Sequence, residues 1–214
     1  GPPIGVEITG LSTIPVISTP IGGPINTTTG RGSIKFSPNG EWLILTAQLA
    51  TSTILPTLYQ FDNSTGLVSN PLTLNSADAH SPSFSPDNTK LYIGQEGSQS
   101  IFQYDLNDLN IAASRIFVGT APSGGALWLL QNAPDGKIYM ESGNNSTTYP
   151  VINNPNIKAP LCNFDPTGFS LNGRAHFSSL SFISSYNESF FNQSPNALDT
   201  LSLWFSVSFS PMCN

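Results

Sequence analysis

The residue types that perform catalysis are rare in this sequence. The chain has two His and two Cys among its 214 residues, and only 9% of its residues are charged. His80 opens a segment rich in Ser and Pro, and His176 follows Arg174 in the stretch NGRAHF. Neither histidine lies near a Gly-x-Ser-x-Gly elbow, the turn that presents the nucleophile of many hydrolases. We therefore predict that His80 is structural, that His176 lies in a surface loop, and that the chain contains no catalytic residue. The alternative for His176 is a pair with Cys162, which lies near it in the sequence.

Candidate metal and cofactor ligands are equally sparse. Cys162 and Cys213 lack the Cys-x-x-Cys spacing of zinc sites, and no Gly-rich phosphate loop precedes a helix. The acidic tracts at residues 62–66 and 105–108 offer oxygen atoms, but neither forms an EF-hand loop. We predict no metal ion and no cofactor. The two cysteines could pair with each other, pair with a partner outside the chain, or stay free.

A few side chains are candidates for contacts or for modification. Trp128 interrupts the local pattern of alternation and could lie on a rim where a sugar or another protein stacks against it. Trp204 lies in an alternating run near the end of the chain and is a second candidate contact. Six Asn-x-Ser/Thr sequons could carry glycans in a secreted protein: Asn26, Asn63, Asn144, Asn145, Asn187 and Asn192.

The charge balance excludes two classes of partner. With 13 Asp and Glu against 7 Lys and Arg, the net charge is −6 and the pI is about 4.6. Binding to nucleic acid or to an anionic membrane surface requires clustered cations, so we predict neither. The uncharged, polar composition favours an extracellular protein. The opening residues GPPIGVEI contain no signal-peptide pattern, and we interpret them as the start of a mature or trimmed segment.

One stretch has the length of a membrane span but not its pattern. Residues 42–61 are uncharged, and about 20 such residues suffice to cross a bilayer. The stretch contains Pro56, Thr, Ser and Gln, and the repeats described next divide it into two strands. We predict that the chain has no membrane span.

The strongest signal is an internal repeat. The segments IKFSPNGEWLIL, PSFSPDNTKLYIG and LQNAPDGKIYM contain Pro38, Pro86 and Pro134, which are spaced 48 residues apart both times. In each segment, alternating side chains lead into a Pro-Asn-Gly or Pro-Asp-Gly-like turn, and a short apolar strand follows. A second element follows each of these segments: TLYQFDNSTG, SIFQYDLND and, more weakly, YPVINNPN. Its alignment places Tyr59, Phe102 and Val151 at matching positions.

These repeats predict an all-β fold. Each unit of about 48 residues contains four short antiparallel strands, which is typical of one blade of a β-propeller. Three such units can be identified, and a closed propeller needs at least four. We therefore predict a propeller-like fold of four-stranded blades that forms an incomplete ring unless the flanking residues complete it.

The repeat segments, together with VINNPNIKAPLCNF and GFSLNGR, resemble the secreted cell-surface propellers of Bacteroidota that accompany gliding motility and type IX secretion. In that family the propeller commonly precedes PKD-like domains. The resemblance implies that residues 31–186 form three blades. It also implies that residues 1–30 supply strands of a preceding blade or an extension, and that residues 187–214 are a linker and a strand. That strand would close a blade or open a following PKD- or Ig-like domain.

The resemblance implies a non-enzymatic segment at the cell surface that serves adhesion, binding of protein or carbohydrate, or assembly of a surface filament. Its partners would be other protein copies or adjoining domains. Two alternatives stay open: a hydrolytic, lactonase-like propeller enzyme, and a purely structural subunit of a filament or assembly. An enzyme would need ligands or acids that converge at a central channel, which the sequence cannot locate.

The end of the chain contains one more expected strand. Residues 201–209 alternate so that Leu, Leu, Phe, Val and Phe share one face, which predicts a β-strand of about nine residues. We expect this strand to pair outside the three repeats, because an exposed apolar strand promotes aggregation.

Overall fold

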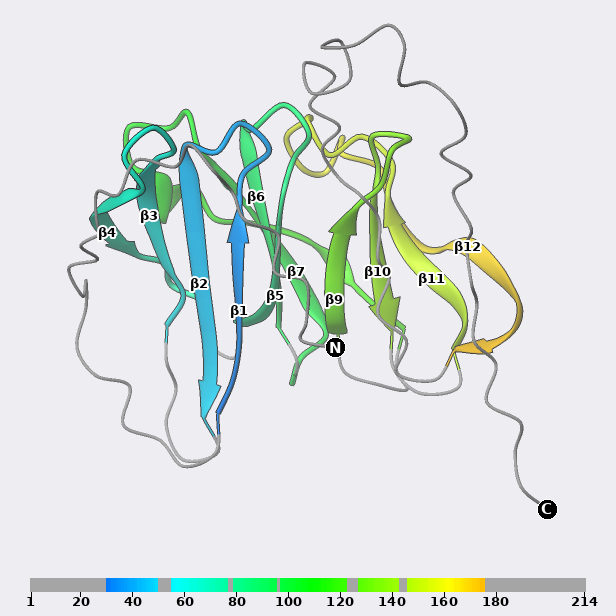
Figure 1. The fold of residues 1–214 in the computed structure, drawn as a ribbon. Helices are drawn as coiled ribbons and strands as arrows, with labels where there is room; N and C mark the ends of the chain where they lie inside the picture. The colour runs from blue at the N-terminus through cyan, green and yellow to red at the C-terminus, as the bar shows by residue number, and fades with distance from the viewer. Residues whose placement is uncertain are drawn as a thin grey trace, which may run out of the picture. The chain divides into compact units, whose positions relative to one another are not determined.

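The computed structural model describes residues 30–49, 55–76, 79–95, 97–122, 127–142 and 146–175. Within these ranges the protein is all-β, apart from one short 3-10 helix. Twelve strands form three four-stranded antiparallel sheets, each from a continuous part of the chain (Figure 1). The prediction of an all-β chain of successive four-stranded units is confirmed.

Within each sheet the strands follow one another in chain order. The first sheet consists of β1 (Gly30–Phe36), β2 (Trp42–Leu49), β3 (Thr57–Asp62) and β4 (Leu67–Thr73). The second sheet consists of β5 (Ala79–Phe84), β6 (Lys90–Gln95), β7 (Ser100–Asp105) and β8 (Ile116–Thr120), with helix η1 (Ile111–Ser114) before β8. The third sheet consists of β9 (Leu127–Asn132), β10 (Ile138–Ser142), β11 (Ser146–Ile152) and β12 (Phe164–Ala175).

The repeated prolines occupy equivalent turns between the first two strands of each sheet. Pro38, Pro86 and Pro134 each follow the residue whose carbonyl oxygen accepts the hydrogen bond that closes the turn. The donors are the backbone N–H groups of Gly40, Asn88 and Gly136, at 2.9, 3.0 and 3.0 Å. These three donors have φ values of +72°, +64° and +77°, a conformation that Gly and Asn adopt most readily. The equivalence of the three turns, predicted from the sequence, is confirmed.

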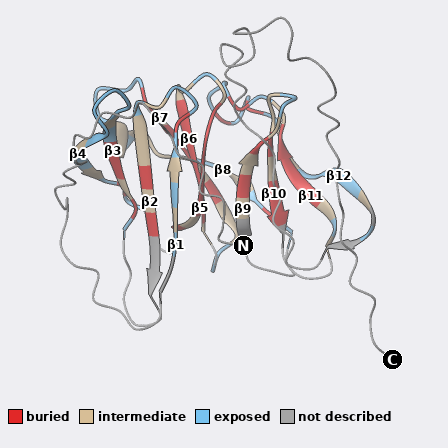
Figure 2. Ribbon diagram, viewed as in Figure 1, coloured by how far each residue is buried: buried red, intermediate tan, exposed pale blue. Residues whose placement is uncertain are grey.

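The sheets pack face to face. We call the face of a sheet on the side of the preceding sheet its leading face and the opposite face its trailing face, and we use the same names at the two ends of the array. The leading face of the second sheet includes Phe84, Leu91 and Tyr104, which form one core with Ile44 and Leu58 of the first sheet. Phe84 is 2% exposed and the other four residues are 7% exposed or less. Figure 2 shows the buried segments concentrated where neighbouring sheets meet.

A second core joins the second and third sheets. Tyr92 and Ile101 on the trailing face of the second sheet pack with Leu130, Ile138 and Met140 on the leading face of the third, and all five are fully buried. The second sheet therefore buries both faces of its strands, which explains why β6 contains the nearly uninterrupted apolar run LYIG.

The strand register corrects the alignment of the second repeat element. The sequence pattern equates Tyr59, Phe102 and Val151. In the structure, Tyr59 pairs with Leu43, Tyr104 with Leu91, and Ile152 with Ile138, so these three residues occupy the equivalent positions. The one-residue difference at Val151 moves that side chain to the opposite face of its sheet, since side chains alternate along a strand.

The stretch with the length of a membrane span forms parts of β2 and β3, as the repeats predict. Among the residues that the structure describes, no helix is long and apolar enough to cross a membrane. The expected strand at residues 201–209 and most of the two predicted flanking segments, 1–30 and 187–214, lie outside the described residues.

Candidate functional site

A partly buried amine lies where the first strands of the three sheets meet. Strands β1, β5 and β9 are in contact with one another in succession, and Lys35 of β1 reaches past β5 to β9. Its Nζ donates hydrogen bonds to the Leu130 carbonyl oxygen and, at 3.2 Å, to Gln131 Oε1. The strands place this side chain because Lys35 pairs with Ile44, whose side chain is buried in the core between the first two sheets.

The surroundings of Lys35 make it chemically distinct from a surface lysine. Burial disfavours the ammonium form and lowers the pKa of Lys35 to about 8. The two oxygen atoms that it contacts engage two of the three protons of an ammonium group. An amine with this pKa is substantially neutral at mildly alkaline pH, so it can accept a proton from water or from a hydroxyl group.

The other two inner strands also carry polar side chains. Ser81 of β5 accepts a hydrogen bond from the Leu130 N–H at 2.5 Å and is 1% exposed. Asn132 of β9 donates to the Phe84 carbonyl oxygen at 2.8 Å. Its Oδ1 atom is buried and has no hydrogen-bond partner within the described part of the chain. The inner strands thus carry amine, hydroxyl and amide groups, whereas β1, β5 and β9 contain no Asp or Glu.

A separate hollow of about 300 Å³ opens beside the first sheet. Its lining residues come from the start of β2 and the residue before it, from the end of β3, and from β4: Glu41, Trp42, Gln60, Phe61, Asp62 and Ser69. Although two carboxylates line it, Asp62 is a poor proton acceptor. The Ser64 hydroxyl and then that of Thr65 lower the pKa of Asp62 to about 2. Asp62 also caps its own turn by accepting from the Ser64 N–H at 2.9 Å, so its role is structural.

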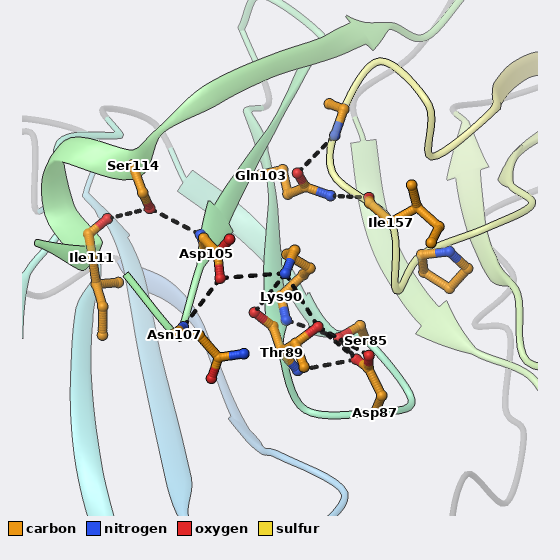
Figure 3. A network of polar contacts seen from close by, with 12 residues as sticks. Ser85, Asp87, Thr89, Lys90, Gln103, Asp105, Asn107, Ile111, Ser114 and Ile157 are labelled. Carbon is orange, nitrogen blue, oxygen red and sulfur yellow. Dashed lines mark hydrogen bonds and ion pairs between the residues drawn. The ribbon is translucent and has the colours of Figure 1, made fainter. Parts of the chain in front are cut away.

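A polar network fastens the second sheet to a loop of the third (Figure 3). Gln103 Nε2 donates to the Ile157 carbonyl oxygen at 2.8 Å, and Gln103 Oε1 accepts from the Ala159 N–H at 2.9 Å. Tyr92 donates to the Pro155 carbonyl oxygen at 2.8 Å, and burial raises the pKa of Tyr92 far above its ordinary value. Because Gln103 binds the backbone at two points and is 2% exposed, this network is structural.

The same figure shows a second cluster, around Lys90. Its Nζ lies 3.3 Å from Asp105 Oδ1, and Ser85 accepts a hydrogen bond from the Lys90 N–H at 2.8 Å. Asp87 in turn accepts from the Ser85 hydroxyl at 2.7 Å. This cluster closes the proline turn of the second sheet and joins it to Asp105 of β7.

The structure locates several residues singled out by sequence. His80 lies half-buried in β5, and its carbonyl oxygen accepts from the Thr46 hydroxyl at 3.2 Å. Trp128 belongs to β9, although its side chain is not described. Cys162 is a free thiol, fully buried, whose pKa burial raises. Asn63 is exposed in the turn between β3 and β4.

The other residues for which the sequence predicts a contact or a modification lie outside the described ranges, so the structure does not test these predictions. They are Asn26, Asn144, Asn145, His176, Asn187, Asn192, Trp204 and Cys213. Among the described residues, no group of three or more His, Cys, Asp or Glu side chains is arranged to hold a metal ion.

Sequence reasoning missed Lys35. The residue stands in the alternating segment Ile34–Lys35–Phe36, where the other two repeats have Ser83 and Gln131. A charged residue at a position that the repeat otherwise fills with neutral polar residues was the available signal. Its importance depends on β1 meeting β9, which the pattern within a single repeat cannot indicate.

No protein-family model and no curated protein matches the chain. Among solved structures, it is similar to the periplasmic gluconolactonase of Pseudomonas aeruginosa, at 16% identity and a TM-score of 0.45, over 68% of this chain and 43% of that one. It is also similar to a 6-phosphogluconolactonase, so named provisionally, of Bacteroides uniformis, at 18% identity and a TM-score of 0.42, over 68% and 44%. A third match is the hydrazine synthase of Kuenenia stuttgartiensis, at 21% identity and a TM-score of 0.41, over 63% and 36%.

The chain spans less than half the length of each of these proteins. Two of these similar structures are named as lactonases, which are enzymes. This finding contradicts the predictions that the chain is not an enzyme and that it serves adhesion, binding or surface assembly. The predicted relationship to Bacteroidota surface propellers is not addressed by these comparisons and stays a prediction.

Proposed function

We propose that the chain is part of a lactonase-like hydrolytic propeller that opens a small cyclic ester. In this proposal the three sheets are consecutive blades, and β1, β5 and β9 line the axis of the ring. The observation that carries the proposal is the Lys35 amine, whose pKa of about 8 suits a general base at mildly alkaline pH. Its contacts with Gln131 and the Leu130 carbonyl oxygen hold the amine in one orientation.

The proposed reaction uses the Lys35 amine to activate water. Neutral Nζ takes a proton from a water molecule while the water oxygen bonds to the ester carbonyl carbon. The resulting tetrahedral species then breaks the bond between that carbon and the ring oxygen. The Lys35 ammonium returns its proton to the departing ring oxygen, and the product is a hydroxy acid. General base catalysis of this kind typically contributes 10²–10⁴-fold to the rate.

The test is hydrolysis of glucono-δ-lactone by the purified chain, followed as acid release in a pH-stat after subtraction of the spontaneous rate. Lys35→Met should lower kcat by at least about 100-fold, and Lys35→Arg should also fail because a guanidinium does not release its proton. The wild-type kcat should rise with pH through about 8. Lys158→Met is the control, because Lys158 is exposed in the loop that precedes β12.

Two results would overturn the proposal. The first is a wild-type chain with no rate above the spontaneous reaction at any pH from 6 to 10. The second is a Lys35→Met variant that retains the wild-type rate and pH profile. Loss of activity in Lys158→Met to the same degree would show that the assay reports folding instead of the Lys35 amine.

We also propose that the protein works outside the cell, which is supported by its low charge and by the exposed sequon at Asn63. Protease digestion of intact producing cells tests this location. Protection of the protein in intact cells, with digestion after lysis, would contradict it.

A further inference from the structure

The two ends of the three-sheet array expose faces that the middle of the array buries. The leading face of the first sheet presents Ile34 and Phe36, which are 63% and 52% exposed. The structurally equivalent residue of the second sheet is Phe84, because Phe36 pairs with Leu43 as Phe84 pairs with Leu91. Phe84 is 2% exposed, since the trailing face of the first sheet covers it.

The leading face of the first sheet is built like its buried counterparts. Its apolar and aromatic members extend over three strands: Ile34, Phe36, Leu43, Leu45, Tyr59 and Phe61. Thr57, which pairs with Leu45, adds a polar residue to this face, and Tyr59 is only 7% exposed. Phe36 and Phe61 pack edge to face with ring centroids 4.8 Å apart. None of the six residues is charged, so covering these side chains desolvates no ionised group among them.

The opposite end of the array presents the trailing face of the third sheet. Phe169 of β12 is 45% exposed there. It packs edge to face on Tyr139, at 5.7 Å, and stacks on Tyr149, at 6.5 Å. In the first and second sheets, the corresponding trailing faces cover the leading face of the next sheet. Within the described residues no sheet follows the third, so this trailing face has no leading face to cover.

The chain thus carries both halves of one interface, which it already forms twice internally. We propose that the leading face of the first sheet docks on the trailing face of the third sheet of a second copy of this chain. Phe36 then takes the place that Phe84 has inside the chain, and Phe169 of the second copy contributes to the surface that covers it. An interface between two different faces is heterologous, and two copies that each supply both faces form a closed pair when the rotation between them brings the second pair of faces together.

This inference is independent of the proposed hydrolysis, because it depends only on the two end faces. The two end faces match because the same kind of interface already occurs twice inside the chain. At both internal junctions, the leading face of one sheet packs on the trailing face of the sheet before it. A second copy supplies the same trailing geometry without any further component. Neighbouring apolar residues that are exposed together, such as Ile34 and Phe36, are a common mark of an interaction site.

The experiment blocks one face at a time in the full chain. Phe36→Glu blocks the leading face and Phe169→Glu blocks the trailing face. Both residues are about half exposed, so the three sheets should fold in each variant, as far-UV circular dichroism can verify. Sedimentation equilibrium should show association of the wild type at micromolar concentration, with a dissociation constant at least roughly 100-fold higher for each variant because a charge is desolvated at the contact.

Mixing the two variants is the decisive measurement. Phe36→Glu retains a trailing face and Phe169→Glu retains a leading face, so an equimolar mixture should form a dimer with one intact junction. Ile157→Glu, at an exposed loop position away from both faces, is the matched control and should associate like the wild type. A wild-type chain that stays monomeric up to 100 µM would overturn the proposal, since another part of the chain or a different protein would then cover these faces. Association that survives in both variants would overturn it as well.

Discussion

Phe36 and Phe84 stand at the same point of the repeat, yet one is 52% exposed and the other 2% exposed. Both residues end the first strand of their sheet and precede an equivalent Ser-Pro turn. The difference arises because a trailing face lies against the second sheet, whereas no described sheet lies against the leading face of the first. Burial in a repeat array is therefore set by the neighbouring unit and not by the residue or its local structure.

The third sheet extends this comparison, because Asn132 stands where the others have Phe. Its side chain is 8% exposed and bonds the Phe84 carbonyl oxygen. A polar residue replaces the apolar one at the junction closest to Gln131 and Lys35. At this junction the array therefore exchanges an apolar contact for a hydrogen bond to the backbone of the preceding sheet.

The largest effect should come from the two phenylalanines. Phe84→Ala removes a fully buried aromatic ring and should lower the free energy of unfolding by about 3–5 kcal/mol. Phe36→Ala, at low protein concentration, should lower it by less than about 1 kcal/mol. Urea denaturation of both variants measures the difference. Equal losses would mean that the leading face of the first sheet is covered within the monomer.

The next effect concerns Lys35 and pH. Its pKa is lowered in the folded state from 10.5 to about 8, so the unfolded chain binds the proton more strongly between these values. The free energy of unfolding should therefore rise between pH 8 and 10.5, by up to about 3 kcal/mol. Lys35→Met should abolish this rise and should be no less stable than the wild type at pH 7. A wild-type stability that is flat across this pH window would contradict the burial of the ammonium group.

The two glutamines of the shared YQFD and FQYD elements provide a smaller contrast. Gln103→Ala breaks the hydrogen bonds to Ile157 and Ala159 and leaves backbone groups without partners, so it should cost about 2–3 kcal/mol. Gln60 is exposed and bonds Asn70, so Gln60→Ala should cost less than about 0.5 kcal/mol. Thermal unfolding of the two variants provides the comparison. Similar costs would imply that Gln103 does not fasten the loop.

The smallest effect should appear in the proline turns. Ser85 is fully buried and bonds both the Lys90 N–H and Asp87, so Ser85→Ala should cost about 1 kcal/mol. The third turn has Ala133 at this place and closes without such a hydroxyl. Ser98→Ala, at an exposed position, should change stability little and is the control. Denaturant midpoints that are the same for Ser85→Ala and Ser98→Ala would show that the buried hydroxyl adds no stability.

The local structure of this protein followed from its sequence. Pro38, Pro86 and Pro134 with their Asn, Asp and Gly neighbours specify tight turns, because each residue type restricts the backbone within a few positions. The apolar runs that follow those turns specify strands for the same reason. These signals are local and periodic, so they predicted the three four-stranded units and the division of residues 42–61 into two strands.

Only the tertiary structure decided which residues meet. Tyr104, and not Phe102, pairs with Leu91, and this choice depends on the strand register. The sequence leaves the register open because both aromatic residues belong to the same short motif, two positions apart. The contact of Lys35 with Gln131 joins residues 96 positions apart, and it exists because the first strands of three sheets converge. Burial of that amine and exposure of Phe36 are likewise properties of packed neighbours, so no single repeat could predict them.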